Sequence, residues 1–229
     1  MIDRQLEAEA MDTAEEAREY DLMDHDMVNA RFVADLLDAS ARLRRPDQDQ
    51  DRSFVVDVGT GTARIPIALC RVRRVGCVAA VDLAYEMLQV ARENVASAQL
   101  SSRVQLQLAR ATALPFRDAC SPVVVSNSLI HHLPDPAGAF REMSRVVSPG
   151  GILFVRDLFR PASLSTVDQL VDTYAGGATA HQRQLLADSL RAALTLEEVR
   201  EATRGLPFAQ MSLAATSDRH WTLAAVRAT

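Results

Sequence analysis

Lysine is absent from this sequence of 229 residues, so all 25 basic side chains are arginines. Without a lysine amine, a protein forms no Schiff base with a carbonyl substrate or with pyridoxal phosphate. It also lacks the lysine that a Walker-type phosphate loop requires. The sequence therefore excludes these three kinds of chemistry.

Cysteines and long apolar runs are also scarce. Three cysteines, Cys70, Cys77 and Cys120, are odd in number and have no CxxC spacing, which is typical of reduced, buried thiols. The first residues lack the apolar core of a signal sequence, and no apolar run approaches the roughly 18 residues of a membrane span. We therefore expect a cytoplasmic protein that does not associate with membranes.

Neither sign of charge dominates, since 30 acidic residues face 25 basic ones and the formal net charge is −5. A protein with this balance lacks the uniform cationic field that binds nucleic acid non-specifically, and no nucleic-acid partner is expected. An apolar fraction of 48% and a mean hydropathy near zero are typical of a globular protein. We predict a single domain over residues 1–229.

Short apolar runs alternate with amphipathic segments from Phe54 onward, which is typical of βαβ units. The runs 54–56 and 123–125 are apolar without alternation, as expected when helices cover both faces of a parallel sheet. We predict strands over 53–58, 77–82, 103–108, 122–127 and 151–156, with helices near 62–73, 84–98 and 135–147. The fold class is α/β, with a doubly wound, Rossmann-like and mostly parallel sheet in the core, residues 53–160.

The segments that flank this core have other patterns. Residues 1–45 have apolar positions at helical spacing and predict two helices that form a lid, followed by a polar break at 46–51. Residues 161–194 interrupt the βα alternation after the fifth strand and predict a helical insertion.

The last segment, 195–229, begins with Thr195, a helix N-cap. Two strand-like runs follow, near 207–214 and 220–226, and the short link between them requires antiparallel pairing. These two runs bring the sheet to seven strands and give it an antiparallel C-terminal strand.

A glycine turn, Gly59-Thr60-Gly61, lies between the first strand and a helix, where backbone N–H groups and the helix dipole can receive a ligand. A dinucleotide fingerprint requires a glycine at position 64, which is Arg64. Asp57 also disfavours a pyrophosphate, because like charges would face each other, but suits a ligand with a cationic amine and a sulfonium. Asp82 ends the second strand about 20 residues further on, the spacing of an acid that binds ribose hydroxyls. These residues indicate an adenosine ligand without phosphates, such as S-adenosyl-L-methionine.

With these features the chain resembles the class I S-adenosylmethionine-dependent methyltransferases, and it is similar to their ubiquinone and menaquinone biosynthesis branch. The resemblance extends from Phe54 to Arg160, somewhat under half of the chain. Its motifs are Val56–Gly61, Ala80–Leu83, Ala111–Phe116, Ser128–Leu133 and Val146–Gly151. The resemblance implies a cofactor site that contains Asp57, Gly59, Thr60, Gly61, Asp82, Leu83, Arg110 and Ala111.

The sequence departs from the family pattern at three places. Ala63 replaces the third glycine of the loop, and Ser121-Pro122 replaces Phe-Asp at the start of the fourth strand. Arg110 stands where the family has an acid that accepts from the adenine amine, so a backbone carbonyl is the alternative acceptor there.

Further candidates lie at the carboxyl ends of the fourth and fifth strands, the edge where open α/β sheets bind ligands. Asn127 faces either the methionine part of the cofactor or the acceptor, or it caps a loop. His131, His132 and Asp157 are candidate catalytic bases, although turn histidines commonly bond to the backbone and Asp157 also suits a surface ion pair.

The flanking helices supply the remaining candidates. Tyr20, with Met23, His25, Asn29 and Phe32, is expected to cover the cofactor as part of the lid. Arg160, Tyr174 and His181 are expected to bind the acceptor, with an exposed turn between helices as the alternative for the last two. Trp221 is predicted to pack at the sheet edge. No group of His, Cys and Asp has metal-ligand spacing, and no metal is predicted.

We therefore expect transfer of a methyl group from S-adenosyl-L-methionine to a small-molecule acceptor by in-line displacement. Oxygen, nitrogen, sulfur and carbon acceptors all remain open. The alternatives are a protein that binds the cofactor without turnover and an enzyme that methylates RNA or protein. A nicotinamide oxidoreductase is the least compatible with the loop.

Overall fold

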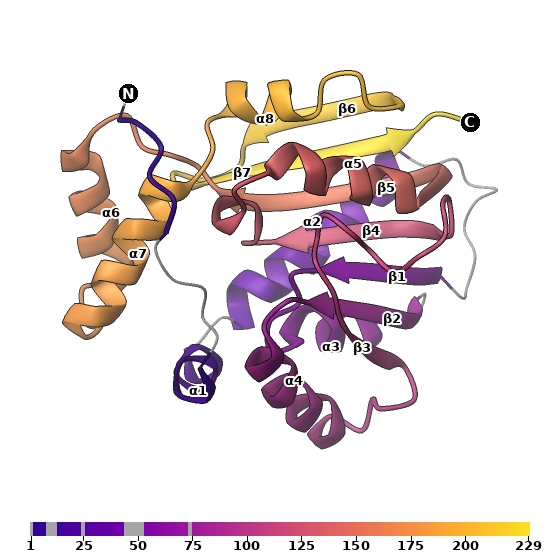
Figure 1. Ribbon diagram of the computed structural model, residues 1–229, viewed down its shortest axis with the longest axis horizontal. Helices are drawn as coiled ribbons and strands as arrows, with labels where there is room; N and C mark the ends of the chain where they lie inside the picture. The colour runs from indigo at the N-terminus through magenta and orange to yellow at the C-terminus, as the bar shows by residue number, and fades with distance from the viewer. Residues whose placement is uncertain (1, 8–12, 24–25, 44–52, 73–74) are drawn as a thin grey trace.

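A computed structural model describes residues 2–7, 13–23, 26–43, 53–72 and 75–229 (Figure 1). In this part of the chain, seven strands form one sheet in the order β3-β2-β1-β4-β5-β7-β6. The strands are β1 (Ser53–Val58), β2 (Val75–Asp82), β3 (Val104–Leu108), β4 (Ser121–Asn127), β5 (Val147–Leu158), β6 (Phe208–Ala215) and β7 (His220–Arg227). The first five strands are parallel, and β7 runs antiparallel to both β5 and β6. The predicted fold class is confirmed.

Helices cover both faces of the sheet (Figure 1). The helices of the described residues are α1 (Ala14–Leu22), α2 (Asp26–Leu43), α3 (Arg64–Cys70), α4 (Tyr85–Ser97), α5 (Pro136–Val146), α6 (Leu164–Ala175), α7 (Ala180–Ala192) and α8 (Leu196–Ala202), with a short 3-10 helix, η2 (Ile130–His132). One apolar core joins α2, α3 and α4 to the sheet and includes Phe32 and Val55. The other joins α5 and α8 to it and includes Phe140 and Leu153. Apolar residues on both faces of each strand explain the unbroken apolar runs of the sequence.

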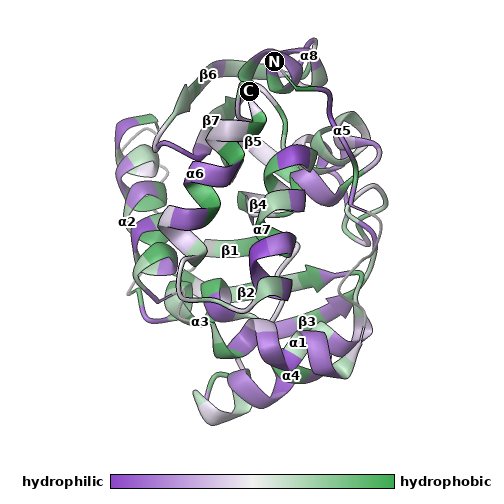
Figure 2. Ribbon diagram, turned by 90° about the vertical axis from the view of Figure 1, so that its left-hand side faces the viewer, coloured by the Kyte–Doolittle hydropathy of each residue, from purple (hydrophilic) through white to green (hydrophobic). Residues whose placement is uncertain are grey.

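The strand order reverses between β1 and β4, which places a topological switch point at the carboxyl ends of these two strands. Figure 1 shows α1, α6 and α7 on the side of the molecule where β1 and β4 end. Figure 2 looks onto that side and shows α6 and α7 in front of the sheet and α1 beside α4. The lid and the insertion therefore face the edge at which a ligand is expected.

Several sequence predictions need correction. β5 begins at Val147 instead of residue 151, because Val147 already pairs with Ser121 of β4. The second N-terminal helix, α2, is part of the core: Phe32 is fully buried, and its ring centroid lies 5.1 Å from that of Phe154. Of the two predicted lid helices, only α1 covers the sheet edge. The predicted break at 46–51 lies outside the described residues.

Trp221 is packed as predicted, but it lies in β7, inside the sheet and away from its edge. None of the helices in the described part of the chain is long and apolar enough to cross a membrane.

Candidate functional site

The loop after β1 approaches its neighbours so closely that a side chain is excluded at one position. Gly59 and Gly61 have positive φ angles of 76° and 53°, a conformation that costs glycine little. A Cβ atom added to Gly59 would lie 2.8 Å from the side chain of Leu129. The backbone N–H groups of Gly59 and Thr60 donate to the carbonyl of Val81. These contacts fix the loop against β2.

The loop also contains a residue with a conformation typical of glycine. Ala63, at the position of the third family glycine, precedes α3 with φ 63° and ψ 25°, in the left-handed region. Its side chain is fully buried. The turn that the family builds with glycine is therefore retained, with a methyl group packed inside.

Two buried carboxyl groups, Asp57 and Asp82, lie on the adjacent strands β1 and β2. Asp57 is 1% exposed, and its Oδ2 atom has no hydrogen-bond partner among the described residues. Burial raises the pKa of Asp57 to about 7, and the charge of Asp82 acts in the same direction. Such a group gains most from a cationic ligand that restores the solvation lost on burial.

Asp82 is held by the backbone. Its Oδ2 atom accepts a hydrogen bond from the N–H of Gly61 at 2.7 Å, and its Oδ1 atom accepts one from Ala84 at 2.9 Å. Burial raises the pKa of Asp82. Each carboxylate oxygen retains a lone pair for another donor, such as a ribose hydroxyl.

Helix α1 lies over the glycine loop through Tyr20. A Cβ atom on Gly61 would lie 3.8 Å from Cε1 of this tyrosine, and burial raises the pKa of its hydroxyl. Asp21 holds the helix in place: it forms an ion pair with Arg64 at 2.7 Å and accepts a hydrogen bond from Asn94 at 2.8 Å. Arg64, which excluded a dinucleotide in the sequence, thus anchors the lid. His25 lies outside the described residues.

The other cofactor candidates lie at or just after the carboxyl ends of β2, β3 and β4. Leu83 follows Asp82 and is 57% exposed, so its apolar surface is open to a ligand. Arg110 is exposed after β3, beside the half-buried Ala111. Asn127 ends β4 opposite Arg156.

Arg156 is a residue at this edge that sequence reasoning missed. It is buried on β5, donates to Thr222 at 3.0 Å and forms an ion pair with Asp35 of α2 at 2.6 Å. Its guanidinium also lies 5.8 Å from the ring centroid of Phe32. The ion pair between Asp35 and Arg156 explains how α2 is fixed to the sheet. No local pattern in the sequence predicts a pair of residues so far apart along the chain.

The three catalytic candidates lie together. Asp157 Oδ1 lies 2.5 Å from His131 Nδ1, and its Oδ2 atom accepts hydrogen bonds from the backbone N–H groups of Ile130 and His131. Burial opposes the charge of His131, but the carboxylate of Asp157 outweighs it and raises the pKa of the imidazole. His131 in turn holds the pKa of Asp157 low. His132 follows on η2 and is partly exposed.

The N-terminal segment supplies a fourth member that sequence reasoning also missed. Glu7 places Oε2 at 2.6 Å from His132 Nδ1 and Oε1 at 3.9 Å from His131 Nε2. The rings of His131 and His132 lie 3.9 Å apart between centroids, so Glu7 and the two histidines form one cluster. Glu7, His131 and His132 bring three possible ligand atoms within 4.8 Å of one another, a grouping that spacing along the sequence did not indicate.

The predicted acceptor residues do not form one site. Arg160 is 5% exposed and donates to the carbonyl of Ala193 and to Glu198 of α8, contacts that favour a structural role. Tyr174, 44% exposed, donates to Asp218 at 2.7 Å, and the Arg219 guanidinium lies 3.3 Å from its ring centroid.

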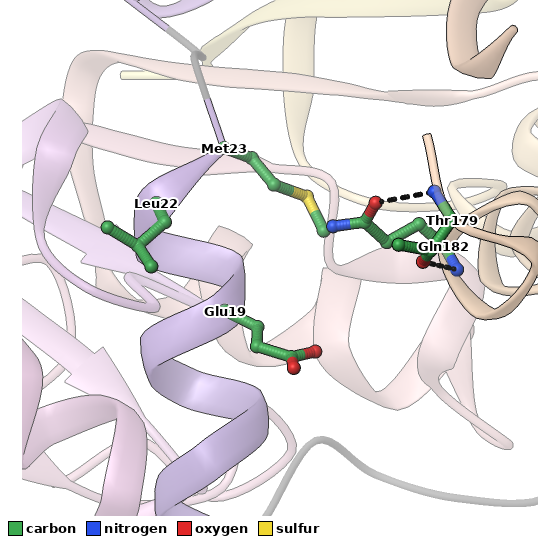
Figure 3. Close-up of a pocket in the computed structure, with 5 residues that line it drawn as sticks. All are labelled: Glu19, Leu22, Met23, Thr179 and Gln182. Carbon is green, nitrogen blue, oxygen red and sulfur yellow. Dashed lines mark hydrogen bonds between the residues drawn. The ribbon is translucent and has the colours of Figure 1, made fainter. Parts of the chain in front are cut away.

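His181, the remaining acceptor candidate, is exposed near the start of α7. Beside it, a cavity of about 210 Å³ opens between the end of α1 and the start of α7 (Figure 3). Its lining residues are Glu19, Leu22, Met23, Thr179 and Gln182. In Figure 3 the side chain of Met23 extends from α1 toward Gln182. The lid and the insertion thus meet around a space of mixed polarity.

Comparisons with known proteins agree with this geometry. Residues 56–155 match the family described as a methyltransferase domain. The uncharacterized protein YafE of Escherichia coli is 33% identical over 52% of this chain and 63% of its own length. A ubiquinone/menaquinone biosynthesis C-methyltransferase of Vibrio cholerae is 30% identical over 58% of this chain and 52% of its own length. The chain thus spans less than two thirds of these relatives.

A solved structure shows the same fold over nearly the whole chain. A putative S-adenosylmethionine-dependent methyltransferase of Methanococcus maripaludis has a TM-score of 0.65 at 16% identity and covers 98% of both chains. Together with the matched domain, this structure confirms the resemblance to the class I methyltransferases.

Proposed function

On the premise that residues 56–155 form a class I methyltransferase domain, we propose that the protein transfers a methyl group from S-adenosyl-L-methionine to a small-molecule acceptor. The observation that carries the proposal is the pair of buried acids, Asp57 and Asp82, at the switch point of the sheet. Asp57 has an unpartnered oxygen beside a loop that tolerates no side chain at Gly59. A cationic amino acid joined to a nucleoside, without phosphates, suits these groups.

The residues present fit this cofactor. In the proposed arrangement Asp57 faces the ammonium end and Asp82 accepts from the ribose hydroxyls, while Leu83 and Ala111 contact the adenine. The loop residues Gly59, Thr60 and Gly61 allow the cofactor to approach closely, while their backbone N–H groups hold the loop against Val81 and Asp82. Tyr20 covers the loop from α1, and Asn127 lies at the carboxyl end of β4, the parallel neighbour of β1. Arg110 is exposed, which supports a backbone carbonyl as the acceptor for the adenine amine.

The chemistry of the reaction places modest demands on the protein. Bound S-adenosylmethionine would supply an electrophilic methyl group to the acceptor atom, with S-adenosylhomocysteine as the leaving group, and a base of the chain would take up the acceptor proton. Orienting the reactants contributes roughly 7 to 11 kcal/mol, more than a general base usually does. The chain's main task is therefore to orient both reactants and to exclude water. His131, His132 and Asp157 are the candidate groups for holding the proton.

The acceptor is proposed to enter between α1 and α7. The cavity there offers the apolar side chains of Leu22 and Met23 beside the polar Glu19 and Gln182, which suits a small organic molecule with both apolar and polar parts. Tyr174 and His181 belong to the insertion, near the end of α6 and the start of α7. Relatives whose names describe quinone methyltransferases support a small-molecule acceptor.

Two measurements test the proposal. Calorimetry should show S-adenosylmethionine binding in the micromolar range to the wild-type protein and far weaker binding to Asp57→Asn, with circular dichroism confirming that both are folded. Isotope-labelled cofactor, incubated with demethylated quinones and other small aromatic and hydroxylated acceptors, should give labelled product. Binding without product from any acceptor pool favours a protein that binds the cofactor without turnover. Absence of binding overturns the cofactor assignment itself.

A further inference from the structure

We infer that Glu7, His131 and His132 form a binding site for a divalent first-row transition cation, of which Zn²⁺ is the best match. Two imidazoles and one carboxylate are ligands that this class of ion prefers. The inference concerns cation binding alone and holds whether or not the protein transfers methyl groups. With a cation bound, His131 and His132 act as ligands and no longer as proton acceptors.

The site is built on a fixed backbone. Arg4 donates to the carbonyls of His131 and Leu133 at 3.1 and 3.0 Å, and to Ala192 of α7 at 2.7 Å. The N–H of Gln5 donates to the carbonyl of Arg191. The segment that carries Glu7 is therefore attached to η2 and α7 by hydrogen bonds immediately before the carboxylate.

Asp157 prepares His131 as a ligand. With Asp157 Oδ1 at 2.5 Å, the imidazole proton lies on Nδ1, and the lone pair of Nε2 is left facing Glu7. A carboxylate or carbonyl on the far nitrogen is the usual partner of metal-binding histidines, because it fixes the ring and makes the ligating nitrogen more basic. Asp157 is itself held by the backbone of η2 and β5.

Glu7 has an oxygen without a partner. Its Oε1 atom is buried and accepts no hydrogen bond from the described residues, and it lies 3.9 Å from His131 Nε2, too far for a hydrogen bond. Tetrahedral zinc with bonds of about 2.0 to 2.2 Å holds its ligand atoms roughly 3.3 to 3.6 Å apart. The 3.9 Å between Glu7 Oε1 and His131 Nε2 is close to this range, whereas Glu7 Oε2 and His132 Nδ1, 2.6 Å apart, are in a direct contact that a bound cation would replace.

Three protein ligands leave a fourth position open, as in catalytic rather than structural zinc sites. His132 is the partly exposed member of the cluster, so a ligand can reach the cation from its side. A cation there suits an acceptor with an oxygen or nitrogen donor atom.

The test uses full-length protein without a histidine tag, freed of metal with a chelator. Titration with Co²⁺ should give the visible absorption of a tetrahedral site at one ion per chain, and Zn²⁺ should displace it. Glu7→Gln should lower Zn²⁺ affinity at least about tenfold. Loss of a residue that only supports a metal ligand already lowers metal affinity about 10- to 100-fold, and Glu7 would be a ligand itself. His181→Gln is the matched control, because it removes an exposed histidine outside the cluster and should leave affinity unchanged.

Three outcomes overturn the inference: no saturable binding to the wild type, unchanged affinity in Glu7→Gln, or an equal loss in His181→Gln. Circular dichroism establishes that each variant is folded. If Glu7→Gln does not fold, His132→Gln gives the same test, since His132 lies at the partly exposed side of the cluster.

Discussion

The carboxylate of Asp82 accepts a hydrogen bond from the backbone N–H of Gly61 at 2.7 Å. This contact joins the acid at the end of β2 to the loop after β1, so both halves of the proposed cofactor site hold each other in place. A change at Asp82 should therefore affect the loop as well as the ribose contacts.

Asp82→Asn should lower the affinity for S-adenosylmethionine at least tenfold. The variant keeps the size of the side chain but removes its charge, and hydrogen bonds to charged groups contribute about 1.5 to 3 kcal/mol each. Isothermal titration calorimetry measures the change. Asp118→Asn is the control, since it removes an exposed carboxylate paired with Arg145 far along the chain. Equal affinities in all three proteins would mean that the ribose is held elsewhere.

Asp57 should make both cofactor binding and stability depend on pH. Its carboxyl has a pKa of about 7 in the folded protein, well above that of an unfolded chain. Between pH 4 and pH 7 the unfolded state loses its proton while the folded state keeps it, so the free energy of unfolding falls as the pH rises, by at most about 1.4 kcal/mol per unit. Cofactor affinity should rise over pH 6 to 8, as the carboxylate forms.

Asp57→Asn should remove both effects. The variant should unfold at a higher temperature than the wild type at pH 8 and bind the cofactor weakly, because the charge that destabilises the fold is the one that the ligand requires. Thermal unfolding and calorimetry over this pH range give the comparison. A variant that is less stable than the wild type at pH 8 would contradict the assignment.

Gly59→Ala should destabilise the protein by at least about 2 kcal/mol and abolish cofactor binding. A positive φ costs a non-glycine residue roughly 1 to 2 kcal/mol, and the new methyl group would overlap Leu129. Gly177→Ala is the control, because nothing lies within 4 Å of a Cβ atom there. Adding Leu129→Ala to the first variant should recover only part of the loss, since the backbone strain remains.

Two N-terminal deletions should behave differently. Removal of residues 1–22 takes away α1 and Tyr20, so the protein should fold but bind the cofactor less tightly. Removal of residues 1–40 also takes away Phe32 and the contact of Asp35 with Arg156, which should cost several kcal/mol, as burial of a large aromatic side chain does. Chemical denaturation separates the two. If both deletions unfold the protein equally, α1 is part of the core.

Local patterns predicted the βα core well because strands buried on both faces have unbroken apolar runs. The proximity of Asp57, Gly59 and Asp82 was predictable for a similar reason. The carboxyl ends of neighbouring parallel strands lie side by side, so the positions of these residues at the strand ends indicate that they are close in space. The start of β5 was missed because the run around Pro149 and Gly150 looks like a turn. Gly150 does have a positive φ of 70°, but β5 already pairs with β4 from Val147, and the register shifts opposite this run.

Contacts between distant segments had no such signal. Glu7 reaches His132 from the far end of the chain, and Asp35 reaches Arg156 from a helix that resembled the rest of the lid. Arg160 and Tyr174 were predicted at the binding edge from their position after β5, whereas their hydrogen bonds to Glu198 and Asp218 had no signal in the sequence. Which partner a long polar side chain selects depends on packing, not on its neighbours in sequence.

The position of β7 between β5 and β6 has a consequence for synthesis on the ribosome. β5 pairs with β4 as soon as it emerges, but its other edge stays bare until α6, α7, α8 and β6 have been made and residues 220–227 are released. A bare, apolar edge strand is a template for aggregation. Nascent chains of this protein should therefore depend on chaperones most during that interval, and chains cut short before β7 should be insoluble.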